Sequence, residues 1–100
     1  MKTYCKLGDR AIIIGGTCGN EGKVVRIIDD IGSHAQGSKV EYRGVIYKCN
    51  ASGQKWGIES EGSPLNCTTG VTRAIRLHED CTMRPLPKIT EPVMELESAE

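Results

Sequence analysis

Four glycines fall within residues 15–22, and this cluster restricts the possible folds of the chain more than any other feature. It joins two runs of branched aliphatic residues, 11–14 and 24–28. Glycine reaches positive backbone φ angles without strain, and asparagine, present here as Asn20, tolerates them. We therefore predict a tight turn between two antiparallel strands, formed by Gly15, Gly16, Gly19 and Gly22.

Short β-branched runs separated by turn residues continue along the chain, at the spacing of a small all-β domain. Helical periodicity is poor almost everywhere. Strands are expected at residues 10–14, 23–29, 39–42, 45–48, 55–59 and 72–77. Turn residues lie between them at 31–38, 50–53 and 62–64. A single helical turn after His78 is expected to lead into an extended segment, 83–86, in which Pro85 suits an edge strand.

Residues 8–28 resemble the KOW motif. The pair Gly8-Asp9 precedes the aliphatic run, Gly15-Gly16 follows it, and the signature glycine corresponds to Gly22. KOW motifs occur in SH3-like barrels, including a ribosomal large-subunit protein and NusG-type transcription factors. The resemblance implies a five-stranded SH3-like barrel of the KOW or Tudor kind over residues 1–86, and contact with RNA, the ribosome or a transcription complex. The turn departs from the family in being about one residue shorter and in lacking lysine.

The length and charge of the chain limit its organisation. One hundred residues form one domain with a single core. Thirteen basic and thirteen acidic residues balance, so there is no overall attraction to nucleic acid or to a membrane. Residues 87–100 hold four glutamates and one lysine, a net charge of −3. We expect them to form a solvated, disordered acidic tail, although their apolar residues could add a strand or a short helix.

The five cysteines lie at least 13 positions apart, so none forms the close pair typical of zinc sites and redox motifs. We expect the cysteines to act as small buried hydrophobic residues, with Cys18 as the one exposed thiol. An odd number of cysteines and an N-terminus without an apolar signal segment favour the cytoplasm. The longest apolar run, 11–14, is too short to cross a membrane. We predict no metal, no cofactor and no small-molecule substrate.

Motifs of enzymes are missing from the sequence. It has no phosphate-binding loop, no esterase nucleophile motif and no zinc-protease motif. The glycine cluster links two expected strands, so it lacks the helix N-terminus that would bind a phosphate. We therefore predict that the protein is not an enzyme.

The favoured function is a small adaptor or inhibitor that binds another protein through loops and one face of the domain. Trp, Tyr and Arg contribute most to protein interfaces, so Tyr47, Trp56 and Arg84 are the candidate anchors. Small barrels of this style are similar to products of phages and other mobile elements, some of which block host proteins. An accessory or sensor subunit of an enzyme is a third, minor option.

The alternative function is RNA or DNA binding in translation or transcription. Basic side chains would contact the phosphate backbone, while Tyr47 and Trp56 would stack on bases. The candidate cations are Lys23, Arg26, Arg43, Lys48, Lys55, Arg73, Arg76 and Arg84. Structural roles stay open for the same residues: Trp56 could fill the core, the cations could be scattered on the surface, and His78 could cap a turn.

Overall fold

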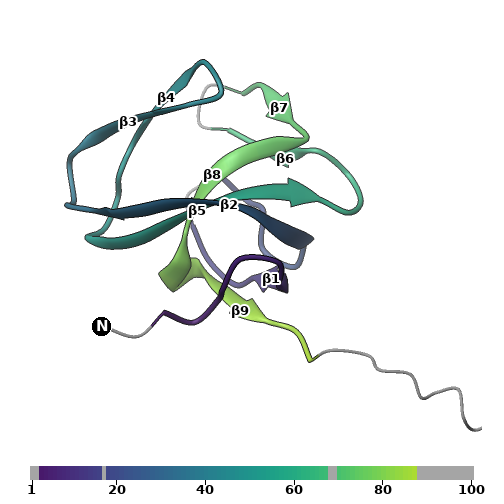
Figure 1. The fold of residues 1–100 in the computed structure, drawn as a ribbon. Helices are drawn as coiled ribbons and strands as arrows, with labels where there is room; N and C mark the ends of the chain where they lie inside the picture. Colours follow the sequence, from purple (N-terminus) through teal and green to yellow (C-terminus); the bar gives the residue numbers. More distant parts are fainter. Residues whose placement is uncertain (1–2, 17, 68–69, 88–100) are drawn as a thin grey trace, which may run out of the picture.

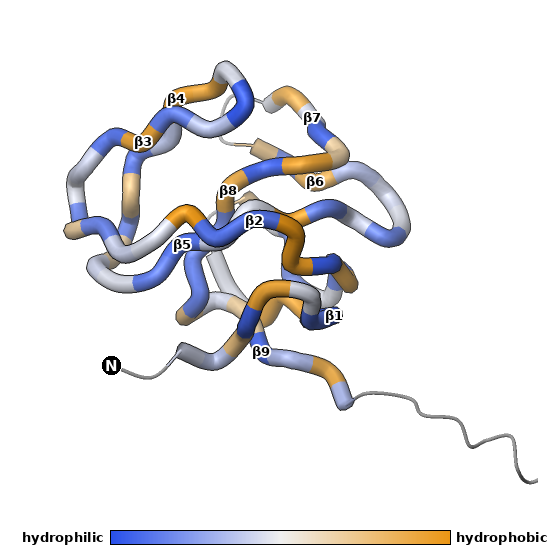
Figure 2. The backbone as a smooth tube through the Cα atoms, in the orientation of Figure 1, coloured by the Kyte–Doolittle hydropathy of each residue, from blue (hydrophilic) through white to orange (hydrophobic). Residues whose placement is uncertain are grey.

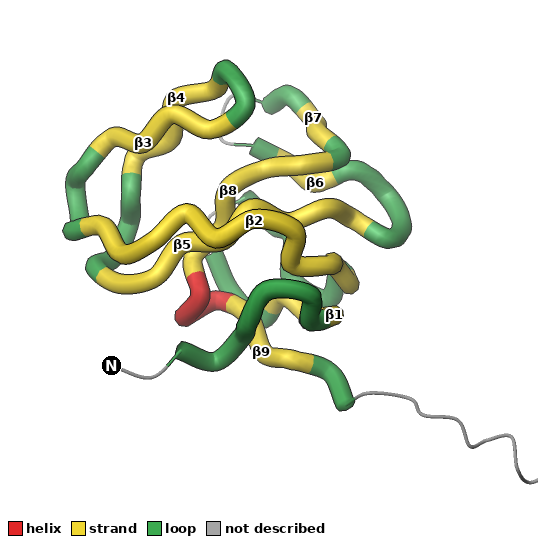
Figure 3. Tube along the Cα trace, viewed as in Figure 1, coloured by secondary structure: helices red, strands yellow, loops and turns green. Residues whose placement is uncertain are grey.

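The computed structural model describes residues 3–16, 18–67 and 70–87, and in this part of the chain nearly all regular structure is β (Figure 1). Its elements are β1 (Arg10–Ile13), β2 (Val24–His34), β3 (Lys39–Tyr42), β4 (Val45–Lys48), β5 (Gly53–Ser60), β6 (Leu65–Asn66), β7 (Thr72–Arg73), β8 (Ile75–Glu79), the 3₁₀ helix η1 (Asp80–Thr82) and β9 (Met83–Pro85). Figure 3 shows η1 as the one helical segment among the described residues. The all-β prediction and the short helical turn are confirmed. The expected acidic tail lies outside the described residues from position 88 onward.

Five strands form one antiparallel sheet in the order β8-β5-β2-β1-β9. Arg10 pairs with Arg26 and Ile12 with Val24, so the glycine cluster does reverse the chain between two antiparallel strands. The sheet is open, with β8 and β9 at its edges, and a closed barrel is not observed. Two further hairpins, β3–β4 and β6–β7, lie at the end of the domain away from β1 and β9 (Figure 1).

The largest differences from the predicted strand boundaries are in β2 and in residues 72–79. β2 continues to His34, through the turn expected from residue 31, because Ser33 and His34 pair with Gln54 and Gly53 of β5. Two irregularities in this pairing bend β2, and Gly32, with a φ of 90°, lies at the second. The expected strand at 72–77 is interrupted by a bend and divides into β7 and β8.

Burial alternates along β1 and the first part of β2, whereas β5 and β8 each bury several consecutive residues. Apolar and hydrophilic residues alternate along β3 and along most of β8, whereas β4 begins with two apolar residues (Figure 2). The largest cluster of buried residues comprises Cys5, Ala11, Ile13, Val25, Ile27, Trp56, Ile58, Leu65 and Met83. Leu65 comes from β6, a two-residue strand that no sequence periodicity could reveal. Trp56 fills the core, which is the structural role that the sequence left open.

The outer edge of β9 is blocked to an incoming strand. β9 forms backbone hydrogen bonds with β1 through every second residue. The backbone polar groups of Met83 and Pro85 therefore face away from β1. Pro85 has no N–H to donate, as an edge position allows. The N–H of Met83 donates to Asp80 O, and its carbonyl accepts from Arg84 Nη1 at 2.8 Å. No backbone donor therefore remains on this short edge.

The outer edge of β8 is covered by side chains at Leu77. The bond from Ser60 N to Ala74 O sets the alternation with β5, so the backbone of Leu77 points outward. Its carbonyl accepts from Arg76 Nε at 2.9 Å. Its backbone also forms a hydrogen bond with the hydroxyl of Tyr47, one of the groups that act on the pKa of that phenol. The edge at β9 and the Leu77 position of β8 are thus protected against strand addition.

Candidate functional site

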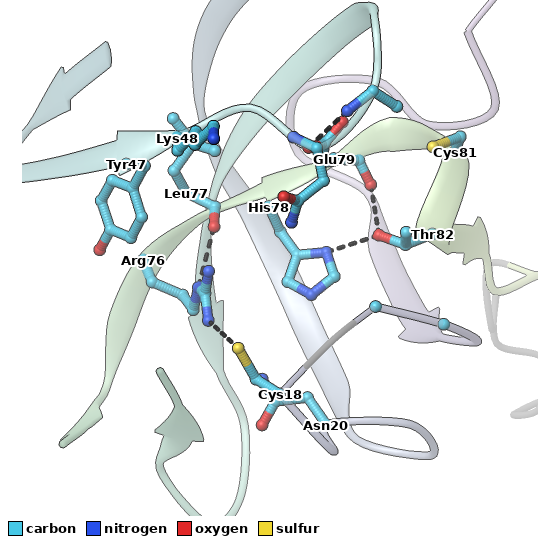
Figure 4. Close-up of a pocket in the computed structure, with 14 residues that line it drawn as sticks. Cys18, Asn20, Tyr47, Lys48, Arg76, Leu77, His78, Glu79, Cys81 and Thr82 are labelled. Carbon is cyan, nitrogen blue, oxygen red and sulfur yellow. Dashed lines mark hydrogen bonds between the residues drawn. The ribbon is translucent and has the colours of Figure 1, made fainter. Parts of the chain in front are cut away.

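A cavity of about 250 Å³ lies between the glycine turn, the end of β4 and the segment from β8 into η1 (Figure 4). Gly15, Gly16 and Cys18 contribute the wall from the glycine turn. Lys48 and His78 contribute from β4 and β8. Segments far apart in the sequence therefore meet around one concave surface.

His78 is buried in the wall of this cavity, with 7% of its surface exposed. Its Nδ1 lies 2.6 Å from Thr82 Oγ1, which itself donates to the carbonyl of Glu79 at 2.7 Å. A hydroxyl has one hydrogen, so Nδ1 must be the donor to Thr82 if both contacts are hydrogen bonds. In a neutral imidazole, Nε2 is then an acceptor.

The environment of His78 keeps the imidazole neutral. Burial, and then the Arg76 guanidinium, lower the pKa of His78 from 6.5 to about 4. Nε2 has no hydrogen-bond partner among the residues that the structure describes, and it points toward the glycine turn in Figure 4. A Cβ on Gly16 would come within 3.7 Å of Nε2, and the φ of 123° there suits glycine. Gly16 thus leaves room beside this nitrogen.

The glycine turn is held in place by Asn20, which is 2% exposed. Its amide group donates to Asn66 O at 3.0 Å and accepts from Asn66 N at 2.8 Å, as a neighbouring strand would. Arg76 Nη1 donates to the same carbonyl at 2.6 Å and lies 3.5 Å from Cys18 Sγ. The Arg76 guanidinium also lies 5.3 Å from the centre of the Tyr47 ring. These contacts fix the cavity wall.

Lys55 and Glu79 form an ion pair beside the cavity, with 2.8 Å between Nζ and Oε1. The Lys55 side chain is fully buried and also donates to Ala51 O at 2.6 Å. Oε2 of Glu79 accepts from the backbone N–H of Asn50 at 2.6 Å and of Ala51 at 3.3 Å. The pair therefore holds the loop between β4 and β5. The proposal that Lys55 contacts phosphate is corrected, because its ammonium is enclosed and satisfied.

Two of the three predicted protein-binding anchors are largely inside the domain. Trp56 is 5% exposed and Tyr47 is 9% exposed, although Tyr47 borders the cavity. The chain has no phenylalanine, so its few large aromatic rings are needed as packing. Trp56 is therefore corrected from a surface anchor to a core residue. Arg84 lies over the ring of Tyr4, with its guanidinium carbon 3.5 Å from the ring centre.

The remaining predicted cations are not brought together into one patch. Lys23 donates to Pro64 O at 2.6 Å, Arg26 pairs with Glu61, and Arg43 pairs with Asp29. Arg73 has a buried Nε without a hydrogen-bond partner among the described residues. Lys48 is exposed at the cavity. Most of these charges already contact acceptors of the chain itself.

The thiols follow the prediction only in part. Cys5 and Cys49 are buried, whereas Cys18 and Cys67 are intermediate and Cys81 is exposed. The expectation that Cys18 is the exposed thiol is therefore wrong. Among the described residues no group of three or more His, Cys, Asp and Glu side chains could hold a metal ion. No helix in this described part is long and apolar enough to cross a membrane.

Sequence reasoning missed the role of His78 and Thr82 in the cavity. The two residues are four positions apart across the predicted helical turn, a spacing that could have indicated their contact. The distant turn at Gly15 and Gly16 could not have been placed beside them without the strand pairing. Comparisons of the chain with protein-family models, with curated proteins and with solved structures give no match.

Proposed function

We propose that the protein is a small non-catalytic binding module, an adaptor or inhibitor, which takes a side chain of a partner protein into the cavity beside His78. The observation that carries this proposal is a buried side chain whose Nε2, among the residues that the structure describes, has no hydrogen-bond partner. A concave surface with a few fixed polar groups is the usual form of a specific recognition site. The blocked positions at β9 and at Leu77 of β8 also favour the cavity over strand addition to the main sheet as the mode of binding.

We also propose that the fold is a variant of the SH3-like barrel with a KOW-like glycine turn. Three features support this: the sheet order β8-β5-β2-β1-β9, the 3₁₀ helix before the last strand, and the glycine turn between β1 and β2. The buried thiols of Cys5 and Cys49 fit a reducing compartment, and we propose the cytoplasm as the site of action.

Nucleic-acid binding has weaker support, because the cations that would contact phosphates are dispersed and largely paired. A titration with mixed single-stranded RNA and DNA at two salt concentrations tests it. Binding that falls steeply with salt and is lost in Lys23→Glu would favour nucleic acid over the cavity. The absence of binding up to about 100 µM near physiological salt would remove this alternative.

Selection from a random peptide library displayed on phage tests the proposed protein-binding function. Enriched peptides are titrated into ¹⁵N-labelled protein, and the amide signals of Gly16, Leu77 and Cys81 are expected to shift together. Lys48→Glu, at the cavity, is expected to weaken binding. Lys39→Glu is the matched control, because Lys39 is exposed on the same hairpin, pairs directly with Lys48 and does not line the cavity.

The outcomes separate cleanly. Enriched peptides whose shifts surround the cavity and whose affinity depends on Lys48 but not on Lys39 support the function. Peptides that bind elsewhere, or that tolerate Lys48→Glu and Lys39→Glu equally, contradict it. The failure of any peptide to be enriched over a mock selection also counts against it.

A further inference from the structure

This inference rests on the proposed function and specifies its ligand. The geometry points to an uncharged carboxamide, the side-chain group of asparagine and glutamine, as the group that enters the cavity and donates an N–H to His78 Nε2. Two features of the cavity lead to this group: the proton position on His78 and the charges of the lining residues. Together they require a ligand group that both donates and accepts a hydrogen bond.

The proton position on His78 is inferred from the two contacts of the Thr82 hydroxyl. Because the Thr82 hydroxyl gives its one hydrogen to Glu79 O, it accepts from His78 Nδ1. The free lone pair of the ring is then on Nε2, which lies on the side of Gly16. A ligand group that contacts this nitrogen must bring a hydrogen of its own. A carboxylate has none, so it cannot satisfy the buried acceptor.

The charges around the cavity disfavour a cationic ligand group. Lys48 and Arg76 line the wall with two positive charges. The carboxylate of Glu79 also lines it, but its oxygens accept from Lys55 Nζ and from backbone N–H groups. An ammonium group of the partner would therefore meet like charge without a free carboxylate.

An uncharged ligand group must therefore carry one hydrogen-bond donor and one acceptor, and these must be on separate atoms. Nε2 of His78 accepts a hydrogen bond from the donor of the ligand. Lys48, whose side chain is exposed and lines the cavity, has N–H groups that can donate to an acceptor of the ligand. A primary amide carries its N–H and its carbonyl oxygen on different atoms, whereas a hydroxyl must use one oxygen for both. The carboxamide is therefore the group that fits.

The first experiment measures the tautomer directly and needs no partner. Two-bond ¹H–¹⁵N spectra at pH 7 are expected to show a protonated Nδ1 and an unprotonated Nε2 for His78. Thr82→Ser keeps the hydroxyl and is expected to keep this pattern, whereas Thr82→Val is expected to shift protonation toward Nε2. A wild-type His78 protonated on Nε2 would overturn the inference.

The second experiment compares four probes of similar length: butanamide, butyrate, butylammonium and 1-butanol. Each is titrated into labelled protein from about 1 to about 200 mM, the range expected for so small a ligand. Butanamide is expected to bind about fivefold more tightly than either charged probe, the ratio that one neutral hydrogen bond contributes. Shifts are expected at Gly16 and in the His78 ring.

Variants at the two histidines complete the test. In His78→Asn the side-chain amide can still donate to Thr82, but the acceptor at Nε2 is lost, so the preference for butanamide is expected to disappear. His34→Asn is the control, because His34 lies in β2 outside the cavity lining. Butanamide binding that survives His78→Asn, or equal binding of 1-butanol, contradicts the carboxamide assignment.

These results are separable from those of the peptide selection. Peptides that bind the cavity without any need for asparagine or glutamine would leave the binding function in place and remove this inference. A correct tautomer with a clear butanamide preference, but without any cavity-binding peptide, would support the ligand chemistry and remove the protein-binding function.

Discussion

Trp56 Nε1 donates a hydrogen bond to Asp80 Oδ1 at 2.9 Å, in the interior of the domain. The same carboxylate accepts from the backbone N–H of Cys5 at 2.9 Å and of Tyr4 at 2.8 Å. One side chain therefore connects the core indole, the N-terminal segment and η1. If the Asp80 carboxylate were removed, each of these three donors would lose its acceptor. The carboxylate is therefore more important to stability than its position in a short turn implies.

Asp80→Asn is expected to destabilise the protein by about 1–3 kcal/mol, because the new NH₂ group would face a backbone N–H. Urea unfolding followed by Trp56 fluorescence measures the change. Asp30→Asn is the control, since Asp30 is exposed and its loss is expected to cost less than about 0.5 kcal/mol. Equal losses in the two variants would contradict the role given to Asp80.

Gly57→Ala is expected to destabilise the protein by about 1–3 kcal/mol through overpacking. A Cβ on Gly57 would overlap the hydroxyl oxygen of Tyr42 and lie 2.9 Å from Cβ of Asp29. The additional cost in a Tyr42→Ala background should be smaller, so a double-mutant cycle should be non-additive. Gly62→Ala is the control, because the space around Gly62 is open. Additive losses would show that Tyr42 does not restrict this position.

The neutral state of His78 predicts a loss of stability in acid. The pKa is about 4 in the folded protein and 6.5 for an unperturbed histidine. The unfolded chain therefore binds more protons between these values, so stability falls as pH drops through this window, by about 3 kcal/mol in total. His78→Asn should lack this part of the pH dependence. Urea unfolding of the wild type and of His78→Asn at pH 7, 5.5 and 4 measures the difference between their free energies of unfolding. This difference would stay constant with pH if His78 did not titrate in this way.

The thiols are expected to react at different rates with iodoacetamide at pH 8. Cys81 is exposed and should be modified first. Burial, followed by the charge of Asp80, raises the pKa of Cys5 to about 12, so almost no thiolate forms there. Burial also raises the pKa of Cys49. Mass spectrometry of the digested protein gives the order of modification, and rapid labelling of Cys5 in the native state would contradict its burial.

The sequence predicted features that depend on local chemistry. The glycine cluster between two aliphatic runs was enough to identify the β1–β2 turn, and Pro85 marked an edge strand. The absence of phenylalanine left a core position open for the single tryptophan, although Trp56 was also predicted as a surface anchor, and that prediction is wrong. The first two inferences succeed because φ restrictions and a missing N–H act at single positions.

The candidate site could not be predicted from the sequence, because it depends on the pairing of segments that are distant along the chain. Lys55 resembles any other strand lysine until β5 pairs with β8 and brings Glu79 beside it. Gly16 and His78 are neighbours only once the sheet has formed. The β6–β7 hairpin is too short to carry any periodicity. Long-range register, rather than residue type, decides each of these features.

The protected sheet edges have a consequence for the behaviour of the protein in concentrated solution. Molecules that collide through the described edges of the main sheet meet a proline at β9 and the side chains that cover Leu77 on β8, so these positions offer few free backbone groups to an incoming strand. Growth of a hydrogen-bond ladder from β9 is therefore disfavoured in the folded protein.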